Sequence, residues 1–243
     1  MIVYGHRGAR GEAPENTIAG ARHAVARGVR ALEIDLRLSA DGQLVVAHDA
    51  GLKRCTGASG KLNQLKAAEL GRLDARADGP PWPNKRGTGI PGMSALYKAV
   101  PEIKHWQLEL KSLGKKNNPA LAAATVDWLR QHKAPAVVTS LEPDLICAVK
   151  EALPNQATGY VSTTAQPEAT LAACDCDFLI AHWQTLTDRR QLRRLQARGI
   201  HISCWTVNDA SVIEQLFKLG VDSVISDYPS MALPLVAALQ RKR

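Results

Sequence analysis

Short β-rich runs alternate with longer helical patterns along almost the whole chain, and this alternation limits the fold more than any other feature. Strands that alternate with helices form a parallel sheet, because each crossover helix returns the chain to the same edge. We expect strands at 2–5, 31–36, 105–110, 136–139, 158–161, 177–181, 201–205 and 221–225. The helices that follow them are expected at 16–26, 93–100, 120–131, 143–153, 168–173, 188–198, 210–219 and 229–239. Eight such units predict an α/β fold, a closed (β/α)8 TIM barrel.

The second strand turns back on itself before the barrel pattern resumes. Asp41-Gly42 is a hairpin turn signal and leads into a short antiparallel strand at 44–47. The stretch 51–92 is rich in Gly, Pro and Lys and contains one short helical pattern at 65–70. A segment of this kind between two barrel elements indicates an inserted loop or subdomain. We therefore predict one domain, residues 1–243, with a small insertion subdomain at 51–92 after the hairpin.

Composition limits the class of protein and its partners. The chain is 45% hydrophobic and 22% charged, which is typical of a globular protein with a core of its own. Its net charge of +8 favours acidic ligands, including phosphorylated small molecules. The basic residues are dispersed along the chain and only 5% of residues are aromatic, so we expect no nucleic-acid partner.

The cysteines and the N-terminus bear on the compartment. An odd number of irregularly spaced cysteines argues against a disulfide framework and predicts reduced thiols, at Cys55, Cys147, Cys174, Cys176 and Cys204. The N-terminus lacks the charged start and long apolar run of a signal peptide, and no later stretch is long enough to span a membrane. We therefore expect a cytoplasmic protein without stable membrane insertion, and a homodimer is left open.

Polar residues gather at the ends of the first predicted strands. They are His6 and Arg7, Glu33 and Asp35, His48 and Asp49 after the hairpin, and Glu109 and Lys111. Because the carboxyl ends of barrel strands lie on one face, we expect these side chains to meet. Glu33 and Asp35 are two residues apart, so they point to the same side of their strand. Close carboxylates repel unless a proton or a cation neutralises them, so together with Glu109 they predict a site for Mg²⁺ or Ca²⁺.

Each of these residues also has a structural interpretation. Either carboxylate alone could form a salt bridge with Arg7, Arg37 or Lys111, but two of them aimed at a barrel interior favour the metal site. Lys111 either balances the acidic residues or binds a phosphate oxygen. A lone histidine at a strand end is more often structural. His6 and His48 placed together around carboxylates favour proton transfer near neutral pH, as cleavage of a phosphodiester requires.

These residues belong to a series of short motifs that follow one another along the whole chain. The motifs are His6-Arg7-Gly8, Pro14-Glu15-Asn16-Thr17, Glu33-Ile34-Asp35-Leu36, Asp41-Gly42 with Val46 and His48-Asp49, Ile90-Pro91, Glu109 with Lys111, Trp205-Thr206-Val207-Asn208 and Asp227-Tyr228-Pro229. In this order the chain resembles the glycerophosphodiester phosphodiesterase family of the bacterial, cytoplasmic type. The resemblance implies a TIM barrel with an insertion after the hairpin strand. One departure is Gly92-Met93, where the family pattern has a small hydroxyl residue followed by an aliphatic one.

The resemblance also implies roles for individual residues. It makes Glu33, Asp35 and Glu109 the ligands of a divalent cation (Mg²⁺ or Ca²⁺), His6 and His48 the general acid/base pair, and Arg7, Lys111, Glu15 and Trp205 the substrate-binding residues. The implied reaction is metal-dependent hydrolysis of a small-molecule glycerophosphodiester to glycerol 3-phosphate and an alcohol.

Two other functions would use similar residues. An enzyme that acts on intact lipids, like phospholipase D or sphingomyelinase D, should carry an exposed apolar loop or a secretion signal with disulfides, whereas the insertion here is polar. A non-catalytic barrel that only binds a phosphorylated ligand should lack one histidine or one acidic residue, and this chain has them all. The sequence therefore favours the hydrolase.

Overall fold

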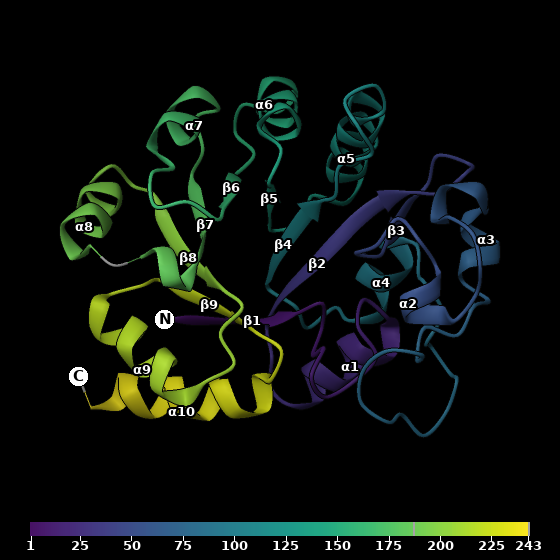
Figure 1. Ribbon diagram of the computed structural model, residues 1–243, viewed down its shortest axis with the longest axis horizontal. Coiled ribbons are helices and arrows are strands. Elements are labelled where there is room, and N and C mark those ends of the chain that lie inside the picture. Colours follow the sequence, from purple (N-terminus) through teal and green to yellow (C-terminus); the bar gives the residue numbers. More distant parts are fainter. Residues whose placement is uncertain (187, 243) are drawn as a thin grey trace.

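The computed structural model describes residues 1–186 and 188–242. Its nine strands form one sheet, in which every neighbouring pair is parallel except β2 (Ala31–Leu38) and β3 (Leu44–Val46). The sheet closes at β1 (Ile2–His6), which pairs with β2 on one side and with β9 (Ser223–Ser226) on the other. Helices surround the closed sheet (Figure 1). The predicted (β/α)8 TIM barrel is confirmed.

Most predicted elements lie within one or two residues of the observed ones. The other barrel strands are β4 (His105–Leu110), β5 (Ala136–Ser140), β6 (Thr158–Ser162), β7 (Phe178–His182) and β8 (His201–Trp205). The helices around them are α1 (Ile18–Ala26), α4 (Met93–Ala99), α5 (Asn118–His132), α6 (Pro143–Ala152), α7 (Glu168–Ala173), α8 (Arg189–Ala197), α9 (Ala210–Leu219) and α10 (Pro229–Arg241). The ranges expected at 105–110, 168–173, 201–205 and 210–219 are met at both ends.

Hydrogen bonds account for two of the boundaries that differ. The helix expected from residue 16 begins at Ile18, because Thr17 is its N-cap and accepts a hydrogen bond from the backbone N–H of Gly20. The strand expected from 221 begins at Ser223, because the N–H of Val221 bonds back to the carbonyl of Leu216 at the end of α9. Local capping thus sets both boundaries.

Alternation along β2 separates the apolar core from the polar barrel interior. Leu32, Ile34 and Leu36 are almost completely buried and pack in the main apolar cluster with side chains of α1, α4 and α5. The residues between them, Glu33 and Asp35, point to the opposite face of the strand. Burial of the apolar face fixes the register of β2, because a shift by one residue would place the carboxylates in the core.

The insertion packs beside β3 and has an apolar cluster of its own. It contains three short helices, α2 (Lys53–Thr56), the 3₁₀ helix η1 (Leu62–Gln64) and α3 (Ala67–Leu70), where only one helix at 65–70 was predicted. The cluster consists of Val45, Ala47, Leu52, Leu62, Leu70, Ala75 and Ile90. Because Val45 and Ala47 lie in or next to β3, the insertion is anchored directly to the segment that leads to His48.

The cysteine prediction is wrong for one pair. Cys147 in α6 and Cys174, which follows α7, form a disulfide, whereas Cys55, Cys176 and Cys204 are free. The sequence spacing gave no sign of this bond. It forms because consecutive helices of the barrel lie side by side and bring the two Cα atoms to 4.8 Å.

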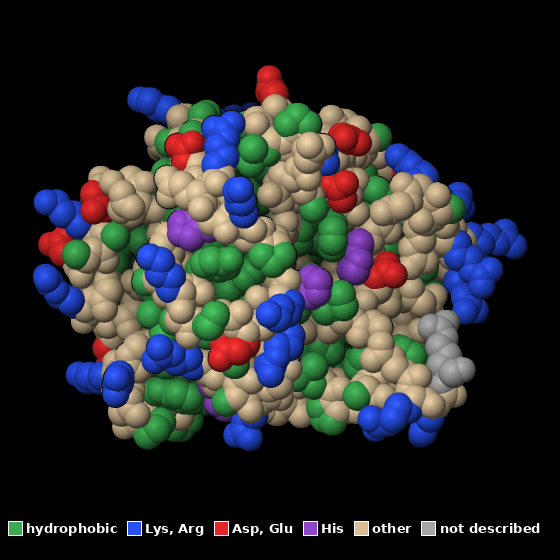
Figure 2. Space-filling view, turned by 180° about the vertical axis from the view of Figure 1, so that it is seen from behind, with side chains coloured by type: hydrophobic (Ala, Val, Ile, Leu, Met, Phe, Trp, Pro, Cys, Tyr) green, Lys and Arg blue, Asp and Glu red, His purple; other side chains and the backbone are tan. Residues whose placement is uncertain are grey.

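The basic side chains on one face of the described structure are dispersed. On the face turned away from the viewer in Figure 1, Lys and Arg side chains stand at many separate places with hydrophobic side chains between them (Figure 2). In the part of the chain that the structure describes, no helix combines the length and apolar character needed to cross a membrane.

Candidate active site

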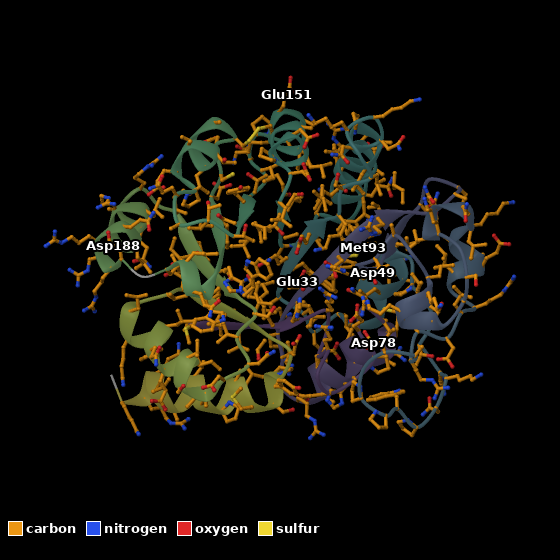
Figure 3. The ribbon with its side chains drawn as sticks, viewed as in Figure 1. Glu33, Asp49, Asp78, Met93, Glu151 and Asp188 are labelled. Atoms are coloured by element: carbon orange, nitrogen blue, oxygen red, sulfur yellow. A yellow bond between two sulfur atoms is a disulfide. The ribbon has the colours of Figure 1, made fainter. Side chains whose placement is uncertain are left out.

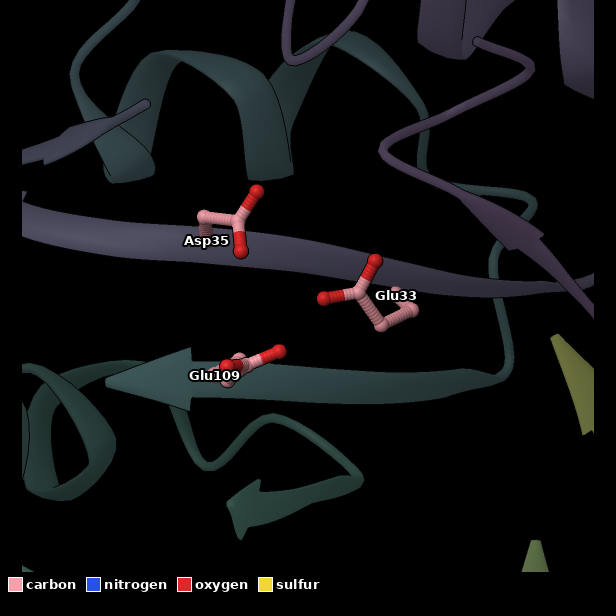
Figure 4. A group of neighbouring side chains, drawn as sticks. All are labelled: Glu33, Asp35 and Glu109. Carbon is pink, nitrogen blue, oxygen red and sulfur yellow. The ribbon is translucent and has the colours of Figure 1, made fainter. Parts of the chain in front are cut away.

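Three carboxylates from two adjacent strands lie together. Glu33 and Asp35 extend from β2 and Glu109 extends from β4, where it stands opposite Asp35 in the register of the sheet. One oxygen of each lies within 4.8 Å of the others, and Figure 4 shows the three groups turned toward one another. Figure 3 places Glu33 near the middle of the barrel. We call these residues the acidic triad; the structure brings them together as the sequence predicted.

The triad has more negative charge than its surroundings neutralise. Burial raises the pKa of Glu33 well above its usual range, and the charges of Asp35 and Glu109 raise it further. Burial also raises the pKa of Glu109, although Lys111 opposes this shift. Burial has the same effect on Asp35, but Lys111 and Arg7 outweigh it and lower the pKa of Asp35. Asp35 is therefore held ionised, whereas Glu33 and Glu109 beside it resist ionisation.

The oxygen atoms of the triad fit a divalent cation. Among the described residues, Glu33 Oε1 is buried without a hydrogen-bond partner, and Asp35 Oδ1 is buried with only the ion pair to Lys111 Nζ at 3.1 Å. Buried carboxylate oxygens without a donor are rare, because losing water without replacement costs free energy. Mg²⁺ and Ca²⁺ prefer carboxylate oxygens, so a cation would satisfy both atoms and neutralise the repulsion.

Arg7 contacts the triad from the loop after β1. Its backbone N–H donates to Glu33 Oε2 at 3.2 Å, and its guanidinium Nε lies 3.1 Å from Asp35 Oδ2. Its backbone φ of 48° lies in the left-handed region, which is unfavourable for a side chain of this size. Asn16, with φ of 55°, supports this turn by donating its own N–H to the Arg7 carbonyl at 2.8 Å. This left-handed backbone conformation directs the backbone N–H and the Nε of Arg7 toward the triad.

Lys111 contacts the triad from the other side. Its Nζ lies 3.1 Å from Asp35 Oδ1 and donates a short hydrogen bond to Glu109 Oε1. Burial lowers the pKa of Lys111, but the two carboxylates outweigh burial and raise it. Lys111 is therefore a fixed cation at the edge of the triad, as is Arg7.

His6 is held by a carboxylate that the sequence did not single out. Its Nδ1 lies 2.5 Å from Asp227 Oδ1, and its Nε2 lies 3.8 Å from Glu33 Oε2. Asn208 donates to the second oxygen of Asp227 at 2.7 Å. Asp227 and Asn208 stand in motifs quoted above, but their role follows only from the pairing of β9 with β1, which brings residues 6 and 227 together.

His48 is held in the same way, from the hairpin side. Its Nδ1 lies 2.6 Å from Asp49 Oδ1. Arg37 in β2 donates to the backbone carbonyl of His48 at 2.8 Å, which fixes the loop. Burial lowers the pKa of His48, although the charge of Asp35 acts in the opposite direction. The His48 side chain is 35% exposed, compared with 10% for His6, so packing restrains His48 less.

Glu15 and Trp205 lie farther from the triad than the residues above. Glu15 is buried and accepts hydrogen bonds from Arg7 and Arg10, at 3.1 and 2.9 Å, so it contacts the basic side chains and none of the carboxylates. Trp205 ends β8, and its ring nitrogen donates to the carbonyl of Ile180 at 3.1 Å. This bond fixes the indole ring, which lies partly exposed beside the ring of His182 at 5.4 Å.

One further residue was missed. Asn16 donates to Asp35 Oδ2 at 2.8 Å and thereby orients the central carboxylate of the triad. The Pro14-Glu15-Asn16-Thr17 motif was the available signal, because an asparagine tolerates the left-handed backbone that this position requires.

Comparison with known proteins agrees with this geometry. Residues 6–231 match the model of the glycerophosphoryl diester phosphodiesterase family. The chain is 26% identical to the glycerophosphodiester phosphodiesterase of Caldanaerobacter subterraneus subsp. tengcongensis, over 97% of each chain. It is 27% identical to lysophospholipase D GDPD1 of Rattus norvegicus, over 93% of this chain and 82% of that protein.

A solved structure has the same fold throughout. It is an Oleispira antarctica phosphodiesterase in complex with its product, sn-glycerol-3-phosphate. That protein is 29% identical, has a TM-score of 0.86, and is matched over 98% of this chain and 97% of its own.

Proposed function

The chain belongs to the glycerophosphoryl diester phosphodiesterase family, and from this premise we propose that it hydrolyses glycerophosphodiesters in a reaction that requires a divalent cation. The products are glycerol 3-phosphate and an alcohol. The acidic triad is the observation that supports the cation, because its three carboxylates lie within 4.8 Å of one another and Glu33 Oε1 is buried without a partner among the described residues. The substrate is a small molecule that enters at the carboxyl ends of the strands.

Glu33, Asp35 and Glu109 would hold the cation, either Mg²⁺ or Ca²⁺. When bound, the cation neutralises the phosphate and stabilises negative charge that develops on its oxygens. Arg7 and Lys111 bind the phosphate beside it, since both are fixed cations at the edge of the triad. A guanidinium and an ammonium group there stabilise the charge that builds up while the phosphorus–oxygen bond breaks.

The histidines exchange the protons. Each has its Nδ1 on a carboxylate, Asp227 for His6 and Asp49 for His48, so the proton stays on Nδ1 and Nε2 is the reactive atom. One histidine removes the proton of the attacking hydroxyl group as its oxygen bonds to phosphorus. The other gives a proton to the departing alkoxide. Water and a hydroxyl group of the substrate both fit as the attacking group; attack by the hydroxyl group gives a cyclic phosphate, which water then opens to glycerol 3-phosphate.

Two residues shape the pocket around the reacting group. Glu15 orients Arg7 through their hydrogen bond and so keeps the guanidinium near the triad. Trp205 offers an apolar wall to the glycerol carbons, because its ring is fixed and partly exposed at the end of β8.

A second candidate substrate class is a lysophospholipid. It is favoured by the similarity to a mammalian lysophospholipase D. The two large hydrophobic side chains exposed in the described chain, Leu141 and Tyr228, lie one and two residues after the carboxyl ends of β5 and β9, where the strands open to the active-site face. A cytoplasmic location stays a prediction, and the Cys147–Cys174 disulfide counts against it, since disulfides persist mainly in oxidising compartments.

The test is release of glycerol 3-phosphate from glycerophosphocholine in the presence of Mg²⁺ or Ca²⁺. We expect turnover that stops in excess EDTA and returns when the cation is restored. Turnover that is unaffected by EDTA contradicts the role of the triad. A parallel assay with lysophosphatidylcholine decides between the substrate classes, because faster hydrolysis of the lipid would favour the second candidate.

A further inference from the structure

Arg54 lies in the insertion, yet its guanidinium contacts two residues that serve the active site. Its Nη1 and Nη2 donate to the two oxygens of Glu15, at 3.0 and 2.7 Å, which is the forked geometry of a strong Arg–carboxylate pair. Its Nε donates to Asp49 Oδ2 at 2.6 Å. Its remaining contact is outward, from Nη1 to Asp78 Oδ2 at 2.5 Å.

Both carboxylates on the inner side of Arg54 have a second partner in the site. The other oxygen of Asp49 bonds to Nδ1 of His48, and Glu15 Oε1 accepts from Nη1 of Arg7. Arg54 is therefore connected to His48 through Asp49 alone and to Arg7 through Glu15 alone. Figure 3 shows Asp49 and Asp78 on the insertion side of Glu33.

We propose that Arg54 is a positioning residue of the active site, which fixes His48 through Asp49 and Arg7 through Glu15. In the described part of the chain it has no direct contact with the acidic triad, so it acts only through these two carboxylates. The inference rests on the proposed function for the roles of His48 and Arg7.

The two histidines explain why such a residue is needed. His6 is enclosed by the barrel, and its partner Asp227 is held by Asn208. His48 and Asp49 lie in a loop, with side chains 35% and 32% exposed, so hydrogen bonds rather than packing must fix their orientation. The hydrogen bond from Arg54 contributes most to lowering the pKa of Asp49 to about 2, which keeps it ionised and able to accept from His48.

A purely structural role is the alternative. Arg54 also donates to Asp78, which lies in the same insertion, and so could serve only to hold the fold of the insertion together. The two roles differ in which contacts matter. Positioning depends on Asp49 and Glu15, whereas stabilising the insertion depends on Asp78 as well.

Turnover of glycerophosphocholine by four single variants, and by the double variant Arg54→Ala/Asp49→Asn, separates these roles. Arg54→Ala should lower kcat/KM by about 10- to 100-fold, the usual effect of removing a group that orients an active-site residue. Arg54→Lys keeps the charge but loses the fork, so it should recover only part of the loss. Asp78→Asn is the matched control and should stay within about 3-fold of wild type. Asp49→Asn should lower kcat, and its effect should be less than multiplicative with that of Arg54→Ala, because both break the same link.

A second measurement does not depend on turnover or on a bound cation. The ¹⁵N chemical shifts of His48 in the metal-free protein report which ring nitrogen carries the proton. We expect the Nδ1-protonated tautomer in wild type and in Asp78→Asn, and loss of this preference in Arg54→Ala.

The outcomes are distinct. Unchanged His48 tautomers together with near-wild-type turnover in Arg54→Ala would overturn the inference. Equal losses in Arg54→Ala and Asp78→Asn, in parallel with lower melting temperatures, would also overturn it in favour of a structural role within the insertion. Absence of turnover in wild type would contradict the proposed function instead, and the tautomer measurement would still decide whether Arg54 orients His48.

Discussion

The two halves of the barrel carry different side chains at the carboxyl ends of their strands. In one half, β1, β2 and β4 carry the charged groups of the site, His6, Arg7, the acidic triad and Lys111. In the other half, β5 to β8 end in neutral or weakly basic residues, Ser140, Ser162, His182 and Trp205. We call them the charged half and the neutral half. Under the proposed function, the phosphate and its cation would bind at the charged half, and the neutral half would contact the organic parts of a substrate.

Loss of the central carboxylate should have the largest effect. Asp35→Asn keeps the size of the side chain but removes the charge that Arg7 and Lys111 face. Because a catalytic cation contributes several kcal/mol to transition-state stabilisation, turnover should fall by roughly 10³-fold or more. Thermal unfolding provides the control for folding. An activity close to wild type would break the distinction between the halves.

Loss of either active-site histidine should have the next largest effect on turnover. His6→Ala and His48→Ala each remove a proton-transfer group, which is worth about 10²- to 10⁴-fold in rate. The measurement is kcat for glycerophosphocholine over a range of pH. A variant that keeps the wild-type rate removes that histidine from the mechanism.

Trp205 tests the neutral half. Trp205→Ala removes an apolar wall, and contacts of this kind are worth about 1–3 kcal/mol in discrimination between substrates. We expect KM to rise by roughly 10-fold with a smaller change in kcat. A large loss in kcat with KM unchanged would show that Trp205 takes part in the chemical step, and would contradict the distinction between the two halves.

The lowered pKa of Glu15 makes the stability of the protein depend on pH. Burial alone would raise its pKa, but the hydrogen bond from Arg54 and the charges of Arg7, Arg54 and Arg10 lower it from 4.5 to about 2. A carboxyl group with a lowered pKa stabilises the fold above its ordinary pKa, and this contribution is lost as pH falls from about 4.5 to 2. Chemical denaturation across this interval should show that wild type loses roughly 3 kcal/mol more than Glu15→Gln, since one pKa unit corresponds to ~1.4 kcal/mol. Glu15→Gln should be less stable at pH 7 and should lose less on acidification.

The disulfide should have the smallest effect on turnover. Cys147 lies in α6 and Cys174 directly follows α7, in the outer layer of helices that covers the neutral half. Cys147→Ala should leave kcat unchanged but lower the free energy of unfolding by roughly 3 kcal/mol, as expected for a closed loop of this length. Reductant should destabilise wild type by a similar amount and leave Cys147→Ala unaffected. A reductant effect in both proteins would point to another cause.

Sequence patterns predicted the fold and the triad because both depend on local periodicity. Alternation in β2 was enough to orient Glu33 and Asp35, and the parallel arrangement of β2 and β4 then brought Glu109 alongside. The partners of the histidines were harder to predict. Asp227 reaches His6 only because the last strand pairs with the first, across 221 positions of sequence. Arg54 and the Cys147–Cys174 bond likewise depend on how surface segments pack, which no local pattern encodes.

The central claim is that the charged half binds one divalent cation that hydrolysis requires. The direct measurement is a titration of metal-depleted protein with Mg²⁺ or Ca²⁺, in which binding and turnover of glycerophosphocholine are followed together. The account predicts that turnover rises in parallel with the binding of one equivalent in wild type, and that Asp35→Asn shows neither. Full turnover by the metal-depleted protein, or equal binding and turnover in Asp35→Asn, would contradict it.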